Sequence, residues 1–302
     1  MSSLKTILIL TFFVVANLVN AQLDPQYTQY HFNQYLINPA FGGLYESTSI
    51  SFNSRAQWYG MEGAPFTNTL TLESSMSDHS GFGLKAMNDR IGVHNNTEIM
   101  ASASYFISSH FVKIGMGLQG GITNVSSDLS LLDSKVLNDP ELDSFVPNSF
   151  QPNFGVGFVI HRFDYFLAVS IPRILETRNT TRSLNDPRYD RNIYVSTGYR
   201  FSLFRSNDTK LQTLVRVMGS RFSFDIAGTY FLTDHIRLGA MIRDYYGASF
   251  FGKIDFDKHF SMGYSFELPT NNLFFTNYGT HEVTLSYVFT PFQNQSPLER
   301  IF

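Results

Sequence analysis

The sequence predicts an all-β protein: a closed antiparallel transmembrane β-barrel of about 14 strands with a short non-strand N-terminal segment. Three observations predict this class. Charged residues make up 16% of the chain, against about 25% in ordinary soluble domains, and aromatic residues also reach 16%. Apolar and small polar residues alternate along many short stretches. The connections between these stretches tend to be short and long in turn, as in bacterial barrels.

The alternation is clearest near the C-terminus. Between residues 259 and 268, large apolar side chains occupy every second position and Ser, Gly or Glu lies between them. The same period of two recurs at 193–203, 222–230 and 282–289. A soluble sandwich also alternates, but its polar face is normally rich in Lys and Glu. Small neutral residues suit a crowded lumen and aromatic residues suit lipid, so the pattern favours a membrane barrel.

Taken in order, the chain divides into a leader, an N-terminal segment, the barrel and a tail. The leader has a positive start, an apolar run at Thr6–Val19 and the small residue Ala21 before the expected cleavage point, as in a secretory signal peptide. A membrane-anchoring helix is the alternative, but the run is shorter than the ~20 residues that a spanning helix needs. The expected parts are residues 1–21 (signal peptide), 22–46 (N-terminal periplasmic or lumen-plugging segment), 47–290 (transmembrane barrel) and 291–302 (short periplasmic tail).

The segment Asp24–Gly43 fits neither a helix nor a strand. It is crowded with aromatic and amide side chains and contains Pro25 and Pro39, which lack a backbone donor. In hydrocarbon every backbone amide must be bonded within the protein. The segment therefore cannot be a lipid-facing strand. We expect it either to lie in the periplasm or to fold into the lumen.

The barrel strands follow from the dyad pattern and from the turn residues between them. We expect strands at 47–57, 66–75, 80–89, 95–107, 110–122, 151–161, 164–171, 191–203, 209–218, 221–231, 235–243, 247–256, 258–268 and 281–290. With a periplasmic N-terminus, all even-numbered connections are short. The odd-numbered ones include the longest, at 124–150, 172–190 and 269–280, although 219–220 is short. This parity favours a closed barrel with its long loops outside.

Several motifs occur along the mature chain. They are Asp24-Pro25-Gln26, Gln29-Tyr30-x-Phe32-Asn33, Ile37-Asn38-Pro39-Ala40-Phe41-x-Gly43, Arg55-Ala-Gln57-Trp58-x-Gly60, Gly63-Ala64-Pro65-x-Thr67, Asn88-Asp89-Arg90-Ile91-Gly92, Phe150-Gln-Pro-Asn-Phe154-Gly155-x-Gly157, Ser170-Ile171-Pro172 and His281-Glu282-Val283-x-Leu285-x-Tyr287. In these motifs the chain resembles the PorP/SprF family, outer-membrane proteins tied to type IX secretion and gliding motility. It departs from the family at Gln34, where a proline is common.

The resemblance implies a non-enzymatic barrel of the bacterial outer membrane. Such a protein would assist type IX secretion, or anchor a large surface adhesin through the adhesin's C-terminal domain. The implied partners are that secreted protein, type IX secretion components and outer-membrane lipid. Nucleic acid is not expected, because the mature chain has a formal charge of 21 − 25 = −4 once Lys5 is removed.

The candidate partner-binding residues lie in the N-terminal segment and in one external loop. They are Asp24, Pro25, Gln26, Asn38, Pro39, Arg173, Arg178 and Arg182. A ring-rich and amide-rich segment suits an interface, and arginines could meet an acidic partner. The alternatives are that the segment only caps the periplasmic end of the barrel and that the loop arginines are merely solvated.

The expected lumen residues have a structural role. Arg55 and Gln57 share the inward face of the first predicted strand, and we expect Glu73 on the next strand to pair with Arg55 across the lumen. No metal or other cofactor is expected, because there is no cysteine and the histidines show no metal-ligand spacing. A general diffusion channel is the alternative function. An outer-membrane hydrolase is disfavoured, because the strands carry no convincing Ser, His and acid constellation.

Overall fold

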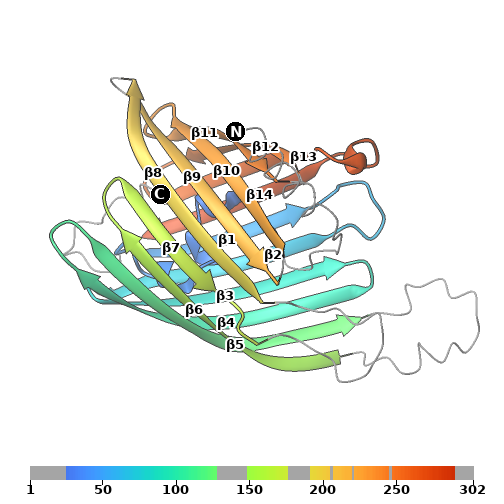
Figure 1. Cartoon of the computed structure of the whole chain (residues 1–302), viewed down its shortest axis with the longest axis horizontal. Coiled ribbons are helices and arrows are strands. Elements are labelled where there is room, and N and C mark those ends of the chain that lie inside the picture. The colour runs from blue at the N-terminus through green and yellow to red at the C-terminus, as the bar shows by residue number, and fades with distance from the viewer. Residues whose placement is uncertain are drawn as a thin grey trace, which may run out of the picture.

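The computed structural model describes residues 25–127, 148–175, 191–204, 207–219, 221–244 and 247–289. These residues form a closed antiparallel barrel in which each strand pairs with its neighbours in the sequence and β1 pairs with β14 (Figure 1). The predicted fold class is therefore confirmed. The expected signal peptide at 1–21 and the expected tail at 291–302 lie outside the described residues.

The strands agree closely with those expected from the dyad pattern. They are β1 (Thr48–Ala56), β2 (Phe66–Ser77), β3 (Ser80–Ile91), β4 (His94–Ser108), β5 (Lys113–Ser127), β6 (Asn148–His161), β7 (Tyr165–Ile171), β8 (Asn192–Phe204), β9 (Asn207–Met218), β10 (Arg221–Phe231), β11 (Ile236–Arg243), β12 (Gly247–Asp255), β13 (Phe260–Pro269) and β14 (Thr280–Phe289). The main difference is at β5, which begins and ends later than the expected 110–122.

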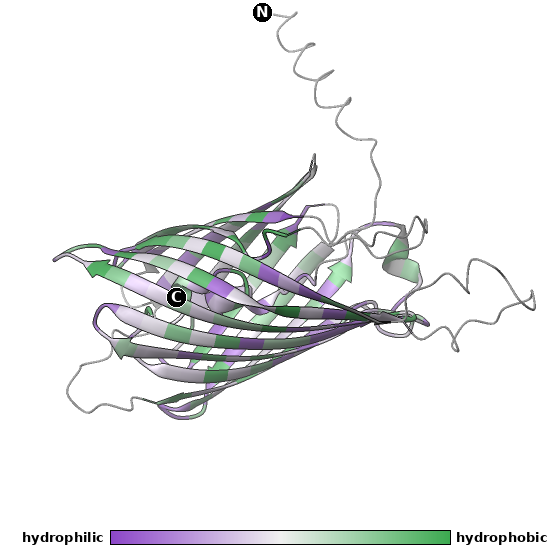
Figure 2. Ribbon diagram, turned by 90° about the horizontal axis from the view of Figure 1, so that it is seen from below, coloured by the Kyte–Doolittle hydropathy of each residue, from purple (hydrophilic) through white to green (hydrophobic). Residues whose placement is uncertain are grey.

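The two faces of the wall have the predicted character. In β1, Ile50 and Phe52 are exposed on the outside, whereas Ser51, Asn53 and Arg55 are buried on the inside. Bands of opposite hydropathy alternate along the strands in Figure 2. A closed sheet with an apolar exterior satisfies the rule that backbone groups in lipid must be bonded internally.

The connections follow the expected parity. Every even-numbered connection is short, whereas the odd-numbered ones include the longest: 57–65, 128–147, 172–191 and 270–279. Residues 128–147 and 176–190 of these lie outside the described residues. The connection at 270–279 contains a short 3₁₀ turn, η5 (Asn272–Phe275). We call the rim that carries the odd-numbered connections the outer rim, and the rim that carries the even-numbered connections the inner rim.

The N-terminal segment contains no strand and lies inside the barrel. It forms three 3₁₀ turns, η1 (Gln29–His31), η2 (Gln34–Leu36) and η3 (Pro39–Phe41), whose residues are all buried. It passes close to the wall at Gly43, whose positive φ of 81° favours glycine and whose Cβ would lie 2.6 Å from the carbonyl oxygen of Ser74. Among the described residues, no helix is long and apolar enough to cross a membrane.

Candidate functional site: the plugged lumen

Residues 25–47, which we call the plug, fill the lumen with side chains. Tyr30, Ala40 and Phe41 have no exposed surface, and the plug packs on the wall in two apolar clusters. One cluster joins Tyr35, Ala40, Phe41, Leu44 and Tyr45 to Phe106, Val159, Phe166 and Ala168. The other joins Tyr27, Tyr30, Leu36 and Ile37 to Tyr194, Leu214, Ala227, Met241 and Phe251. The inside of this barrel is therefore a packed core.

A row of alternating charges runs around the inner wall near the outer rim. Arg55 contacts Glu282 at 3.1 Å and Glu267 at 3.3 Å. Arg243 then contacts Glu267 at 3.0 Å and Asp225 at 3.2 Å. The members of this charge ladder are Arg55 (β1), Glu282 (β14), Glu267 (β13), Arg243 (β11), Asp225 (β10) and Arg216 (β9), the last of which pairs with Asp225. Three cations balance three anions, so the buried charges compensate one another.

The charge ladder holds the start of the plug by its backbone. The carboxylate of Glu282 accepts hydrogen bonds from the backbone N–H of Thr28 at 2.7 Å and of Gln29 at 3.0 Å. These donors lie at the start of η1, where a helical turn leaves N–H groups unpaired. Arg55 donates to the hydroxyl of Thr28 at 2.9 Å, and Arg243 donates to the carbonyl of Tyr27 at 2.9 Å. The ladder therefore fixes both the position and the direction of the plug at this end.

Two lysines of the wall hold the rest of the plug in the same way. Lys210 donates to the carbonyl of His31 at 3.0 Å, and Lys113 donates to the carbonyl of Leu44 at 3.1 Å. Lys113 also pairs with Glu46 at 3.0 Å. The contacts with His31 and Leu44 are made to backbone carbonyls. They therefore depend on the path of the plug more than on its side chains.

Inward-facing glycines let the plug approach the wall closely. A Cβ at Gly157 would overlap Asn38, and a Cβ at Gly117 would overlap Ala40 and lie 2.5 Å from the carbonyl carbon of Pro39. Both glycines lie opposite each other on β5 and β6. The η3 turn therefore sits in a recess that only glycine leaves open.

We predict that Gly157→Val releases η3 from this recess. The added side chain occupies the space of Asn38 and Pro39, so the plug should become cleavable by protease in detergent while the barrel stays folded. The matched control is Gly228→Ala on β10, where a Cβ meets nothing within 4 Å. Equal protease resistance of the two variants would contradict the close approach.

His31 is buried in the plug without a polar partner for its ring. The ring lies 4.7 Å from that of Phe251 and 4.1 Å from that of Tyr30, centroid to centroid, and neither ring nitrogen has a hydrogen-bond partner among the described residues. Burial, reinforced by the positive charges of Lys210, Arg243 and Arg216, holds the pKa of His31 well below its usual value of 6.5.

We predict that acidification weakens the hold on the plug through His31. The released segment binds a proton below pH 6.5, whereas the seated one stays neutral, so seating is strongest above that pH and is lost as the pH falls toward the lowered pKa. Protease cleavage of the plug, measured from pH 7.5 to about 5, should rise in the parent chain. A His31→Gln variant should show a flatter profile, and identical profiles would refute the role of His31.

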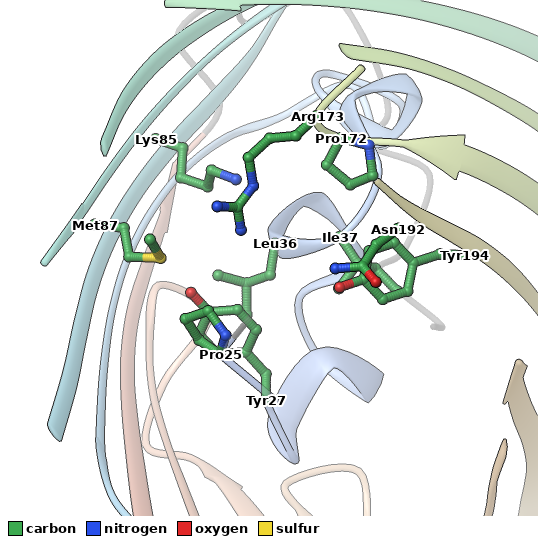
Figure 3. Close-up of a pocket in the computed structure, with 10 residues that line it drawn as sticks. All are labelled: Pro25, Tyr27, Leu36, Ile37, Lys85, Met87, Pro172, Arg173, Asn192 and Tyr194. Atoms are coloured by element: carbon green, nitrogen blue, oxygen red, sulfur yellow. The ribbon is translucent and has the colours of Figure 1, made fainter. Parts of the chain in front are cut away.

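A second charged cluster flanks a small cavity between the plug and the opposite wall. Glu98 on β4 contacts Lys85 on β3 at 2.9 Å and Arg173 at 3.5 Å. Figure 3 shows Lys85 and Arg173 beside the cavity, with Pro25 and Tyr27 of the plug on its other side. The described residues contain no group of three side chains placed to hold a metal ion.

Comparison with known families decides the assignment. The family model described as type IX secretion system membrane protein PorP/SprF matches residues 19–287. The chain belongs to the PorP/SprF family. A comparison with curated proteins finds no match.

One solved structure, the transporter TbuX, supports the fold of this PorP/SprF protein. The toluene transporter TbuX of Ralstonia pickettii is 9% identical, with a TM-score of 0.50, over 83% of this chain and 91% of that chain. The toluene transporter TodX of Pseudomonas putida is 10% identical, with a TM-score of 0.48, over 88% and 95% of the two chains. At this level of identity the likeness to TbuX shows the membrane β-barrel fold alone.

The candidate partner-binding residues of the N-terminal segment that the structure describes lie inside the lumen. Asn38 caps η3 by accepting from the N–H of Ala40 at 2.9 Å, and its amide donates to wall carbonyls of β6 and β7. Pro39 is buried at the first position of the same turn, and Gln26 is also buried. Pro25 lines the cavity beside Arg173. The candidates Asp24, Arg178 and Arg182 lie outside the described residues.

The expected pairing of Arg55 with Glu73 is wrong. In the β1–β2 register, Arg55 lies opposite Thr67 and Glu73 lies opposite Ser49, near the other end of the barrel. Arg55 pairs with Glu267 and Glu282 instead. Gln57 follows the end of β1, where its backbone N–H donates to Pro65.

Sequence reasoning missed the other members of the charge ladder. Arg216, Asp225, Arg243, Glu267 and Glu282 each stand at an inward position of an alternating strand. A charge at such a position needs a partner, so the pattern signals that these residues pair. Which charges meet depends on strand register, which the sequence does not give.

Proposed function

We propose that this PorP/SprF protein is a non-enzymatic component of the bacterial outer membrane that assists type IX secretion or anchors a large secreted surface protein. Its partners would be that protein, engaged through its C-terminal domain, and components of the secretion system. The family assignment supports the link to type IX secretion. The single observation that supports a role other than an open channel is the plug, which is hydrogen-bonded to the wall along its length.

The plug argues against the alternative of a general diffusion channel. A porin needs an aqueous path, but here aromatic plug residues and compensated buried charges occupy the lumen. We therefore propose that the partner contact lies at the outer rim. Arg178 and Arg182 remain candidates for it, whereas the side chain of Arg173 is mostly buried beside Glu98. Asn38 and Pro39 would support it indirectly, by keeping the plug seated.

Gentle solubilisation of native membranes tests the proposal. The barrel should copurify with a large surface protein, and deletion of the barrel gene should remove that protein from the cell surface. Purified barrel should give no steady conductance in a planar bilayer. A barrel recovered alone, with unchanged surface proteins in the deletion strain, would refute the function.

A further inference from the structure

The outward face of β2, β3 and β4 is apolar over most of its height. Outward residues of these strands form rows in register, and two successive rows consist of Leu72, Leu84 and Ala101 and of Leu70, Ala86 and Ile99. On β4 the apolar outward positions continue from Ile99 to Ile107 near the inner rim. This stretch is roughly 30 Å of strand, or about 23 Å along the axis at a tilt of about 40°. It therefore matches the apolar band of about 25 Å that faces hydrocarbon in membrane barrels.

The same face becomes polar at the next row toward the outer rim. That row consists of Asn68, Asn88 and Thr97, and the row after it consists of Phe66, Arg90 and Asn95. We call the five polar residues of these two rows the amide face. The turn between β3 and β4 follows at 92–93. The amide face therefore lies at the edge of the apolar band, at the level of the lipid headgroups.

The amide face presents hydrogen-bonding groups to the outside of the barrel. The amide of Asn88 donates to the side-chain oxygens of Asn95 at 2.7 Å and of Thr97 at 3.0 Å, which holds these side chains in one layer. The side-chain amide of Asn68, the amide nitrogen of Asn95 and the guanidinium of Arg90 bond to no other group in the described part of the chain. Such groups are costly against hydrocarbon, so they require a polar environment.

The chain that borders the amide face at the outer rim is described throughout. The connections at 57–65 and 92–93 are joined by a hydrogen bond from the N–H of Gly92 to the carbonyl of Gly63 at 2.9 Å. Arg90 is exposed and forms no ion pair with any described carboxylate, including that of Glu62 in the first of these connections. Arg90 is therefore available to an anion from outside the chain.

We propose that the amide face binds the headgroup of a phosphorylated glycolipid in the outer leaflet of the membrane. The inference rests on the proposed function in one respect, that the outer rim lies outside the cell. Arg90 would pair with a phosphate, which a guanidinium fits with two parallel hydrogen bonds. Asn68 and Asn95 would bond to sugar hydroxyls, and the ring of Phe66, which is 44% exposed, would cover the apolar side of a sugar ring.

The width of the amide face favours a sugar headgroup over a simple phospholipid. Its side chains come from three neighbouring strands, which are spaced about 4.8 Å apart and so spread the polar groups over about 10 Å. A single phosphate would engage Arg90 and leave the amides of Asn68 and Asn95 without partners. Linked sugars that carry a phosphate would engage all three.

Lipid binding to the purified full barrel tests the proposal. The probes are lipopolysaccharide, dephosphorylated lipopolysaccharide and phosphatidylglycerol, and bound lipid is measured by native mass spectrometry. We expect lipopolysaccharide to bind about tenfold more tightly than either other lipid. Arg90→Gln should weaken its binding by about tenfold and Asn68→Leu by about threefold. The matched control is Arg162→Gln, which changes a half-exposed arginine at the inner rim and should bind as the parent does.

Photo-cross-linking in intact cells tests the position of the site. Benzoylphenylalanine replaces Phe66 or, as the matched control, Phe163, which is 63% exposed in the connection between β6 and β7 at the inner rim. We expect position 66 to become joined to lipopolysaccharide, detected with an antibody against that lipid, and position 163 to remain free of it. All variants should keep the parent's change in gel mobility on boiling.

The outcomes separate this inference from the proposed function. Equal binding of lipopolysaccharide by the parent and Arg90→Gln, or equal binding of lipopolysaccharide and phosphatidylglycerol by the parent, would overturn the inference alone. Cross-links from position 66 to residues 128–147 of the same chain, or to another protein, would do the same. A barrel that binds lipopolysaccharide as expected but copurifies with no surface protein would refute the proposed function alone. Lipopolysaccharide joined to position 163 and not to position 66 would overturn both the inference and the proposed partner contact at the outer rim.

Discussion

Deleting residues 25–42 is expected to turn a closed barrel into a conducting channel. The plug supplies the inner members of both apolar clusters, and the wall behind it is lined largely by Ser, Thr, Asn and charged side chains that water can solvate. In planar bilayers the parent chain should show background conductance, whereas the deletion variant should show stable steps. The wall contains its own closed ladder of hydrogen bonds, so the barrel should remain folded without the plug.

Two controls keep this result interpretable. The deletion variant should still change its gel mobility on boiling, which reports a closed barrel. A smaller change, Gly117→Val, should produce intermittent openings because it displaces η3 while the rest of the plug remains present. Equal conductance of the parent and the folded deletion variant would mean that the plug does not block the lumen.

Replacing Glu282 with alanine should cost the most stability of any single substitution in the lumen. Its carboxylate accepts from Arg55, from Asn53 and from the N–H groups of Thr28 and Gln29. Removing it leaves a buried guanidinium with one fewer anion and leaves two plug donors unpaired. We expect a loss of about 3 to 5 kcal/mol in the free energy of unfolding, measured by urea denaturation in detergent.

The matched controls separate charge from position. Glu282→Gln keeps an acceptor oxygen and should lose less than Glu282→Ala. Asp208→Ala breaks a pair with Arg200 in which both side chains are partly exposed, and it should cost about 1 kcal/mol or less. If Glu282→Ala costs no more than Asp208→Ala, the charge ladder does not stabilise the plugged barrel.

The sequence predicted the wall well because the wall depends on a local pattern. The period of two in stretches such as 259–268 specifies both a strand and its lipid-facing side, and the short turns set the topology. The N-terminal segment was also predicted not to be a strand, since Pro25 and Pro39 exclude it. The sequence does not specify whether it lies in the periplasm or in the lumen, because burial in the lumen depends on contacts distant in sequence.

The contacts of the site depend on register and could not be read from the pattern. Arg55 was expected to pair with the carboxylate of the following strand in the sequence, Glu73. The observed partners come from β13 and β14, because barrel closure places the last strands beside the first. The sequence predicts the early end of β7, because the alternating stretch at 164–171 is short and is followed by Pro172. The extent of its pairing with β6, from Val156 to His161, follows only from the register.

Cross-linking between the plug and the wall tests the central claim most directly. The chain contains no cysteine. Asn33 donates to the hydroxyl of Thr71 at 2.9 Å inside the lumen, whereas the adjacent Leu70 is 48% exposed on the outer face. With a short thiol cross-linker, Asn33→Cys should join Thr71→Cys in native membranes and should not join Leu70→Cys. Absence of a cross-link to position 71, with residue 33 freely labelled by a water-soluble thiol reagent, would contradict a plugged lumen.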